Sequence, residues 1–361
     1  MRFQHPFAIA LAAGLAAACG SSEPAKPAPA AQPAAAPAPP PKLRVYVTNE
    51  WSGDLTVIDA ETQTAIGTYK LGKRPRGIQA SPDGKSLYVA LSGSPPAPPG
   101  VDEKTLPPPD RAADGIGEID ADTYQVKRII HAGNDPEQLA VSADGARLYV
   151  ANEDAAQASV VDLASGTVVA AVKTGDEPEG VKIRPDGKVV YVTSEEDGAI
   201  FAIDTATNAV IKRVTAGHRP RGIAFLPDGS RAYVTLENDG ALALIDAQKH
   251  TFVKLIQLKG EGKTPKPRPM GIAVNPDGSM IYVTTGSFGK LFFLDPKKNE
   301  TVGDLEVGQR PWGVVLLPDN KTIYTANGPS NDVSIVDLTT RTVVKKIKAG
   351  DRPWGVAVIS R

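Results

Sequence analysis

The chain has 361 residues, a formal net charge of −1 and no polybasic run, so nothing in it favours a nucleic-acid partner. Its length allows a large buried core, and its 34 glycines and 32 prolines are typical of a turn-rich all-β protein or of an unstructured tail. Because Cys19 is the only cysteine, an intramolecular disulfide and a covalently attached c-type haem are excluded.

The first 18 residues have the features of an export signal. A positive start at Met1-Arg2 precedes an apolar stretch, residues 7–18, which is too short to cross a bilayer as a helix. The run Leu15-Ala16-Ala17-Ala18-Cys19-Gly20 resembles the lipobox of bacterial lipoproteins. That resemblance implies cleavage before Cys19 and acylation of its thiol, which would anchor the protein to a membrane. The anchored protein would face the periplasm, from the outer rather than the inner membrane, or would lie at the cell surface. An ordinary secretory signal with an incidental cysteine is the alternative.

The segment after the signal has an unusual composition. Residues 19–42 are mostly proline and alanine, and such a segment cannot bury a core. We therefore predict a lipoprotein signal peptide over residues 1–18, a tether over residues 19–42 that begins with the lipidated Cys19, and one folded domain over residues 43–361.

The folded domain contains seven copies of a short x-Pro-x-Gly turn, one of them with glutamine in the last position. The copies are Arg74-Pro75-Arg76-Gly77, Asp135-Pro136-Glu137-Gln138, Glu177-Pro178-Glu179-Gly180, Arg219-Pro220-Arg221-Gly222, Arg268-Pro269-Met270-Gly271, Arg310-Pro311-Trp312-Gly313 and Arg352-Pro353-Trp354-Gly355. Their prolines are 61, 42, 42, 49, 42 and 42 residues apart, so a unit of 42 residues with insertions of 19 and 7 explains the spacing. This period is typical of the four-stranded blades of β-propellers.

Each unit contains four strand signals and nothing that predicts a helix. In the third unit the signals lie at residues 180–184, 189–194, 199–204 and 209–214. After the last turn only one strand signal remains, residues 356–359, whereas the domain begins with three, at residues 43–48, 55–59 and 66–71. We therefore predict an all-β, seven-bladed β-propeller with four antiparallel strands per blade. Its last blade should be closed by the C-terminal strand, as the innermost, and three N-terminal strands.

The repeats resemble the YVTN family of β-propellers. The motif itself is Tyr46-Val47-Thr48-Asn49, and Tyr191-Val192-Thr193-Ser194 and Tyr324-Thr325-Ala326-Asn327 are variants of it. The chain is also similar to exported propellers found alongside pyrroloquinoline-quinone-dependent catabolic systems, through Asp135-Pro136-Glu137, Glu177-Pro178-Glu179-Gly180 and residues 327–333. The second resemblance implies an accessory role without a demonstrated activity.

All seven proline turns should open on one face of the propeller, together with the loops that follow the second strand of each blade. The larger insertion, near residues 92–114, is rich in proline and should lie as a stiff loop across or beside the central opening. Arginine and tryptophan beside each other suit a planar anion or a protein partner. The candidate binding residues on this face are Arg74, Arg76, Glu137, Glu179, Arg219, Arg221, Arg268, Arg310, Trp312, Arg352 and Trp354. The alternative is that the turn recurs for folding alone, with an extended residue before each proline and charges that pair from blade to blade.

The sequence contains no motif of a catalytic or metal site. No two of its four histidines are spaced as a metal-binding pair, and no nucleophile elbow is present. We predict a monomeric, exported, lipid-anchored binding or scaffold module for a small anionic molecule or a periplasmic protein, without a metal, a cofactor or nucleic acid. The alternative is a carboxylate-based, lactonase-like hydrolase or lyase at the central opening, which would use Glu137 and Glu179 with an arginine as anion clamp. A purely structural envelope component is a third interpretation.

Overall fold

The structure, a computed structural model, describes residues 42–96, 101, 105–259 and 266–360. The predicted signal peptide, the predicted lipidation site Cys19 and the predicted tether up to residue 41 lie outside these residues. The described part is built from strands and loops, with two three-residue 3-10 helices, η2 (Arg111–Ala113) and η3 (Glu153–Ala155). No helix in this part of the chain is long and apolar enough to span a membrane.

The strands form seven antiparallel sheets of four strands, which we call blades 1 to 7. Blade 1 consists of β4 (Pro75–Ala80), β5 (Ser86–Leu91), β6 (Gly115–Asp120) and β7 (Val126–Ile130). Blade 2 consists of β8 (Pro136–Val141), β9 (Arg147–Asn152), β10 (Gln157–Asp162) and β11 (Thr167–Lys173). Blade 3 consists of β12 (Pro178–Ile183), β13 (Val189–Ser194), β14 (Ala199–Asp204) and β15 (Ala209–Thr215). Blade 4 consists of β16 (Pro220–Phe225), β17 (Arg231–Leu236), β18 (Ala241–Asp246) and β19 (Thr251–Gln257). Blade 5 consists of β20 (Pro269–Val274), β21 (Ile281–Thr285), β22 (Lys290–Asp295) and β23 (Glu300–Glu306). Blade 6 consists of β24 (Pro311–Leu316), β25 (Thr322–Asn327), β26 (Asp332–Asp337) and β27 (Thr342–Lys348). Blade 7 combines β28 (Pro353–Ser360) with β1 (Leu43–Asn49), β2 (Asp54–Asp59) and β3 (Thr64–Lys70).

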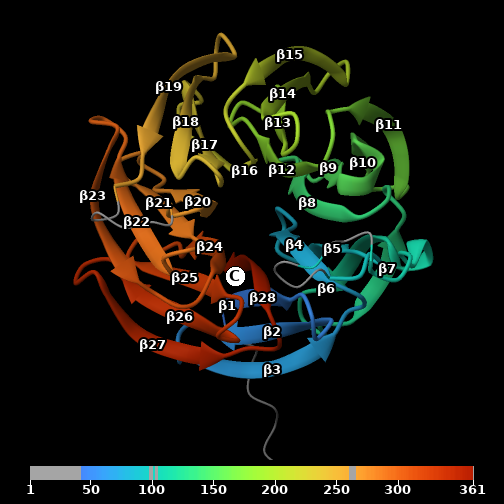
Figure 1. The fold of residues 1–361 in the computed structure, drawn as a ribbon. Helices are drawn as coiled ribbons and strands as arrows, with labels where there is room; N and C mark the ends of the chain where they lie inside the picture. Colours follow the sequence, from blue (N-terminus) through green and yellow to red (C-terminus); the bar gives the residue numbers. More distant parts are fainter. Residues whose placement is uncertain (1–41, 97–100, 102–104, 260–265, 361) are drawn as a thin grey trace, which may run out of the picture. The chain divides into compact units, whose positions relative to one another are not determined.

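The ring is closed by pairing between the two ends of the described chain, as the strand count predicts. Strand β28 pairs antiparallel with β1, with Ile359 opposite Arg44 and Val356 opposite Val47. The innermost strand of every blade contacts the innermost strands of the two neighbouring blades, β28 included (Figure 1). The seven-bladed propeller with four antiparallel strands per blade is therefore confirmed, and so is its closure.

The core lies between the blades. Each large cluster of buried apolar side chains is drawn from two adjacent blades; one joins blades 3 and 4 and another joins blades 6 and 7. The tyrosines of the repeated motif, such as Tyr46 and Tyr191, are fully buried there. This face-to-face packing of the sheets around a ring leaves only the outermost strands largely exposed.

The threonine of the motif links neighbouring blades through hydrogen bonds. In blade 3 the register of the innermost strand shifts after its proline, which leaves the Gly180 N–H without a ladder partner. The Gly180 N–H donates to Thr193 Oγ1 at 2.7 Å, and that hydroxyl donates to the Arg221 carbonyl of blade 4 at 3.0 Å. A β-carbon at Gly180 would lie 2.0 Å from the same carbonyl oxygen, so the glycine permits the close approach of the two inner strands.

Candidate functional site

The proline turns and the loops after the second strands meet on one face, as the sequence predicts. In six blades the carbonyl of the residue before the proline accepts the N–H of the first residue after the second strand; an example is Glu153 N to Asp135 O at 3.0 Å. All seven residues before the prolines take a positive φ, between 39° and 56°, including Arg74 of blade 1, where the Ser92 N–H donates to the Lys73 carbonyl instead. The expectation of extended geometry at these positions is therefore wrong, because the hydrogen bond to the exit loop outweighs the steric preference imposed by proline.

The residues after the prolines point inward and are mostly buried. Arg76, Glu137, Glu179, Arg221 and Trp354 are each at most 7% exposed. Five of these seven residues, all except Glu179 and Met270, border a central hollow of about 480 Å³ on the loop face, which we call the upper cavity. Nine predicted residues line it: Arg74, Arg76, Glu137, Arg219, Arg221, Arg310, Trp312, Arg352 and Trp354.

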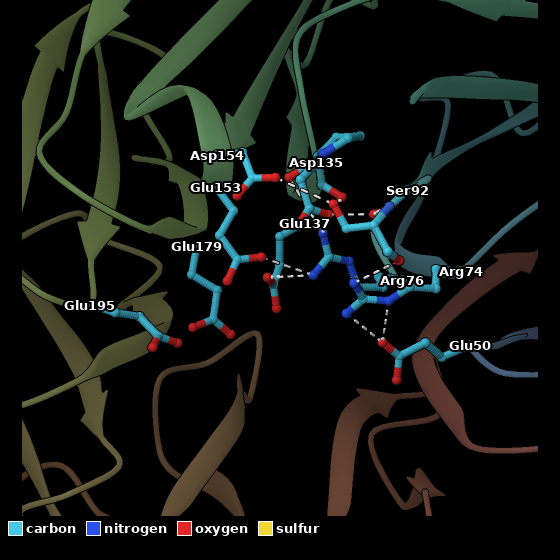
Figure 2. A network of polar contacts seen from close by, with 12 residues as sticks. Glu50, Arg74, Arg76, Ser92, Asp135, Glu137, Glu153, Asp154, Glu179 and Glu195 are labelled. Atoms are coloured by element: carbon cyan, nitrogen blue, oxygen red, sulfur yellow. Dashed lines mark hydrogen bonds and ion pairs between the residues drawn. The ribbon is translucent and has the colours of Figure 1, made fainter. Parts of the chain in front are cut away.

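The upper cavity contains a buried cluster around Arg76 of blade 1 (Figure 2). Its guanidinium donates to Glu137 Oε2 at 2.8 Å and to Glu153 Oε2 at 3.1 Å, and it also pairs with Asp135. All three carboxylates belong to blade 2, so this cluster joins two blades. Burial acts to raise the pKa of Glu137, but the charges of Arg76 and Arg221 and the hydrogen bond with Glu153 together outweigh it and keep the pKa of that carboxyl below its usual range.

A second cluster surrounds Arg221 of blade 4. Arg221 pairs with Glu179 and Glu195 of blade 3 and with Glu237 of its own blade, and its Nη2 lies 2.8 Å from Glu195 Oε1. Two further arginines complete the cluster, because Arg219 pairs with Glu195 and Arg268 pairs with Glu237. The predicted alternative of pairing from blade to blade thus describes most of these charges.

Two carboxyl groups in the clusters hold protons unusually tightly. Burial, reinforced by the Glu137 charge, raises the pKa of Glu153 well above its usual value, and a hydrogen bond joins these two carboxyls. In blade 3, burial and the Glu195 charge likewise raise the pKa of Glu179. The Glu137–Glu153 pair therefore combines a carboxyl of lowered pKa with one of raised pKa, an arrangement found in acid–base sites and also in purely structural networks.

The opposite part of the cavity wall, on blades 6 and 7, is basic and aromatic. The rings of Trp312 and Trp354 stack with centroids 5.3 Å apart, and the Arg310 guanidinium lies 5.0 Å from the Trp312 centroid. The Arg352 guanidinium lies 4.6 Å from the centroid of the half-exposed Trp51. The two tryptophans therefore pack against each other as well as bordering the cavity.

Arg310 and Arg352 differ from the other arginines of the ring. Neither forms an ion pair with a carboxylate in the described part of the chain. Burial, together with the charges of Arg221 and Arg268, lowers the pKa of Arg310. These two guanidiniums are therefore available to bind an anion, whereas the other arginines of the ring are already paired with carboxylates.

A second hollow shares part of its wall with the upper cavity. Arg221, Trp312 and Trp354 line both the upper cavity and this hollow of about 520 Å³ beneath it, which we call the lower cavity. Glu179 lines only the lower cavity, and Arg268 lines neither. Glu137 and Glu179, which the enzymatic alternative places in one site, are therefore not brought together on one cavity.

The proline-rich insertion borders the upper cavity where it is described. Pro95, Pro96, Pro107 and Pro109 line the hollow, and Arg111 pairs with Asp154 of blade 2 at 2.5 Å. Ser92, at its start, donates to the Asp135 carboxylate. The predicted position beside the central opening is thus observed for the described residues of this loop.

Sequence reasoning did not select Glu153 as a site residue. It follows the second strand of blade 2, sixteen positions after Glu137, and Glu195 and Glu237 occupy the corresponding positions in blades 3 and 4. That repeated acidic position was the available signal. Among the described residues, no group of three or more His, Cys, Asp or Glu side chains is arranged to hold a metal ion.

The raised pKa values predict a specific pH dependence of stability. Glu153 and Glu179 hold protons more tightly in the folded state, so their contribution is complete below the unfolded pKa of about 4.3 and is lost as the pH rises to the folded pKa. Each such group contributes a slope of at most about 1.4 kcal/mol per pH unit. We expect urea denaturation between pH 5 and 9 to show a shallower loss of stability in Glu179→Gln than in the unmodified chain. The exposed Glu196→Gln is the control, and equal slopes in all three chains would contradict the assignment.

Comparisons with known proteins agree with this architecture. Residues 181–351 match the model of a family described as lactonase, 7-bladed beta-propeller. Two Salmonella proteins, from S. typhi and S. typhimurium, each called uncharacterized protein YncE, are 36% identical over 52 residues. That match spans 14% of this chain and only 15% of the length of these curated relatives.

Three solved structures have the same fold at low sequence identity. A predicted 6-phosphogluconolactonase from Bacteroides uniformis superposes with a TM-score of 0.71 at 19% identity, over 88% of this chain and 99% of that one. A second, from Bacteroides fragilis, gives a TM-score of 0.69 at 18% identity, over 88% of this chain and 98% of that one. Hydrazine synthase from Kuenenia stuttgartiensis gives 0.65 at 23% identity, over 78% of this chain and 89% of that one. These structural similarities show the fold. In a separate comparison, the family model that matches residues 181–351 is that of the seven-bladed lactonase propellers.

Proposed function

We propose that the upper cavity is the active site of a lactonase-like hydrolase that acts on a small anionic cyclic ester. One observation carries this proposal. A proton-sharing carboxyl pair, Glu137 and Glu153, and two guanidiniums without carboxylate partners, Arg310 and Arg352, line the same cavity. The match of residues 181–351 to a lactonase propeller family supports it. The enzymatic alternative of the sequence analysis is thereby preferred to the binding module, with Glu153 in place of Glu179.

The arrangement suits ester hydrolysis by general acid–base catalysis. Arg310 and Arg352 would bind the anionic group of the substrate and orient its ring towards blade 2. The ionised carboxylate of Glu137 accepts a proton from a water molecule whose oxygen forms a bond to the ester carbonyl carbon. The acyl–oxygen bond of the ring then breaks, and Glu153 donates its proton to the departing oxygen. The proton on Glu137 returns to Glu153 through the hydrogen bond that joins them, and the product is a hydroxy acid.

The test is lactone hydrolysis by the full-length chain, with acid release followed in a pH-stat. The panel contains γ- and δ-lactones of sugar acids, with and without a phosphate group. We expect kcat for the best substrate to fall roughly 10²- to 10⁴-fold in Glu153→Gln, because the amide donates no proton. Glu196→Gln, an exposed change, should leave kcat unchanged, and Arg310→Met should mainly raise KM.

A binding module for a planar anion is the second candidate, favoured by the stacked tryptophans beside Arg310. Saturable binding of an aromatic acid or of pyrroloquinoline quinone without any product, weakened by Arg310→Met, would support this candidate against the hydrolase. The predicted lipid anchor at Cys19 would place either activity at a membrane surface in the periplasm. Cell fractionation of the unmodified chain and of Cys19→Ala tests that placement.

A further inference from the structure

Most of the residues that line the lower cavity have apolar side chains. It is formed by the ends of the seven innermost strands that lie away from the loop face, and its volume is about 520 Å³. The residue three positions after each proline is Ile, Leu or Val in every blade, and all seven of these residues line the hollow. They are Ile78, Leu139, Val181, Ile223, Ile272, Val314 and Val356. A hollow of this size and polarity is typical of a small-molecule site.

One cation interrupts this apolar wall. Four positions after the proline, the seven blades carry Gln79, Ala140, Lys182, Ala224, Ala273, Val315 and Ala357. Lys182 is thus the one charged residue at that level of the ring. Its side chain is open to the cavity, and it forms no ion pair or hydrogen bond with another described side chain. The surrounding protein atoms make the amine less well solvated, which lowers its pKa.

The ceiling of the lower cavity differs from its wall. Met270, Trp312 and Trp354 form an apolar surface there, and Arg221 is already paired with three carboxylates. Glu179 also reaches the ceiling; it is 4% exposed, and its Oε2 lacks a hydrogen-bond partner in the described part of the chain. The ceiling therefore offers apolar contact and one carboxyl oxygen, but no uncompensated positive charge.

We propose that the lower cavity binds an amphipathic monocarboxylic acid, whose carboxylate pairs with Lys182 and whose hydrocarbon chain extends towards Met270 and the two tryptophans. A neutral hydrocarbon would leave the amine without a partner in apolar surroundings, which is unfavourable. A polyanion would meet only one cation without a carboxylate partner among the described residues of the wall, Lys182. A single anionic head with an apolar chain satisfies both parts of the site.

The dimensions of the site select chains of medium length. Lys182 and Glu179 lie three residues apart on β12, a rise of about 10 Å along a strand. An extended octanoate chain spans a comparable distance, whereas butanoate is too short to reach the ceiling. This site is separate from the upper cavity, so the inference does not depend on lactone hydrolysis.

The test is calorimetric titration of the full-length chain with butanoate, octanoate and octan-1-ol. We expect saturable binding of one octanoate per chain, at least tenfold tighter than that of butanoate or octan-1-ol. Lys182→Met should weaken octanoate binding at least tenfold, and Lys182→Arg should largely retain it. Lys188→Met, an exposed lysine on the turn that follows β12, is the matched control and should bind as the unmodified chain does.

Two further measurements keep the outcome independent of folding defects and of the proposed activity. Octanoate should protect Lys182 of the unmodified chain from reductive methylation by formaldehyde and cyanoborohydride, and Glu153→Gln should bind octanoate normally. Equal binding of octan-1-ol and octanoate, unaltered binding in a folded Lys182→Met, or the absence of saturable octanoate binding would each overturn the proposal. Failure of lactone hydrolysis alone would leave it standing.

Discussion

A chain that ends at Asp351, and therefore lacks β28, should not form a closed propeller. Strand β28 supplies the innermost strand of blade 7, where Trp354, Ala357 and Ile359 are buried. Its loss would leave β1 with an open edge and would expose the apolar faces of blades 1 and 6, which β28 contacts through β4 and β24. We expect the truncated chain to lose its cooperative thermal transition in near-ultraviolet circular dichroism and to aggregate.

The control for this truncation is a chain that ends at Ile359. Ser360 is exposed, so the shorter deletion should change the midpoint of unfolding very little. A synthetic peptide of residues 352–361 added to the longer truncation should restore part of the native signal, because the missing strand docks as a separate piece. A cooperative transition at an unchanged temperature without β28 would show that the ring closes in another way.

Much of the architecture could be predicted because the repeat makes it redundant. A turn that recurs every 42 residues predicts the blade, and the one strand left after Trp354-Gly355 predicts the closure. The loop face could be predicted for the same reason, since every blade places its proline turn and its second-strand exit on the same side. Repetition supports these predictions even where one copy is altered, as at Gln138.

The details of the site depend on geometry that the repeat does not reveal. In six blades the residue before the proline has a positive φ and its carbonyl accepts an exit-loop N–H, a contact between segments about 18 residues apart everywhere except in blade 7. The bulge after the proline decides that Arg76 and Arg221 point inward. Which carboxylate becomes protonated depends on burial and neighbouring charges, so Glu153 was not distinguished by sequence from Glu195.

Lys182 in the lower cavity is a second feature that the sequence alone does not reveal. In the sequence it is one lysine in a short strand, where polar and apolar residues alternate as in any strand. Only the ring shows that the six residues at the same level are five apolar residues and one glutamine, and that the amine forms no ion pair with an acidic side chain in the described part of the chain. A comparison of blades position by position could have found it as an exception within the repeat.

The Arg221→Met variant should lose more stability than any other single change in the arginine ring. Arg221 pairs with Glu179, Glu195 and Glu237, each of which is at most 4% exposed. Without the guanidinium these carboxyls would stay close together in a buried region without compensation, which costs about 3–5 kcal/mol for a broken buried pair. Urea denaturation at pH 7 measures the loss.

Arg310→Met is the matched control, because both guanidiniums lie about 5 Å from the centroid of Trp312 but Arg310 has no carboxylate partner. We expect Arg310→Met to change stability by less than about 1 kcal/mol, since an unpaired charge leaves no orphaned partner behind.

Lowering the pH towards 4 should reduce the difference between Arg221→Met and the unmodified chain, because protonation removes the repulsion among the carboxylates. Adding Glu179→Gln and Glu237→Gln to Arg221→Met should recover part of the lost stability at pH 7. Equal losses in the two arginine variants would mean that contact with Trp312, rather than the ion pairs, determines the contribution of these side chains.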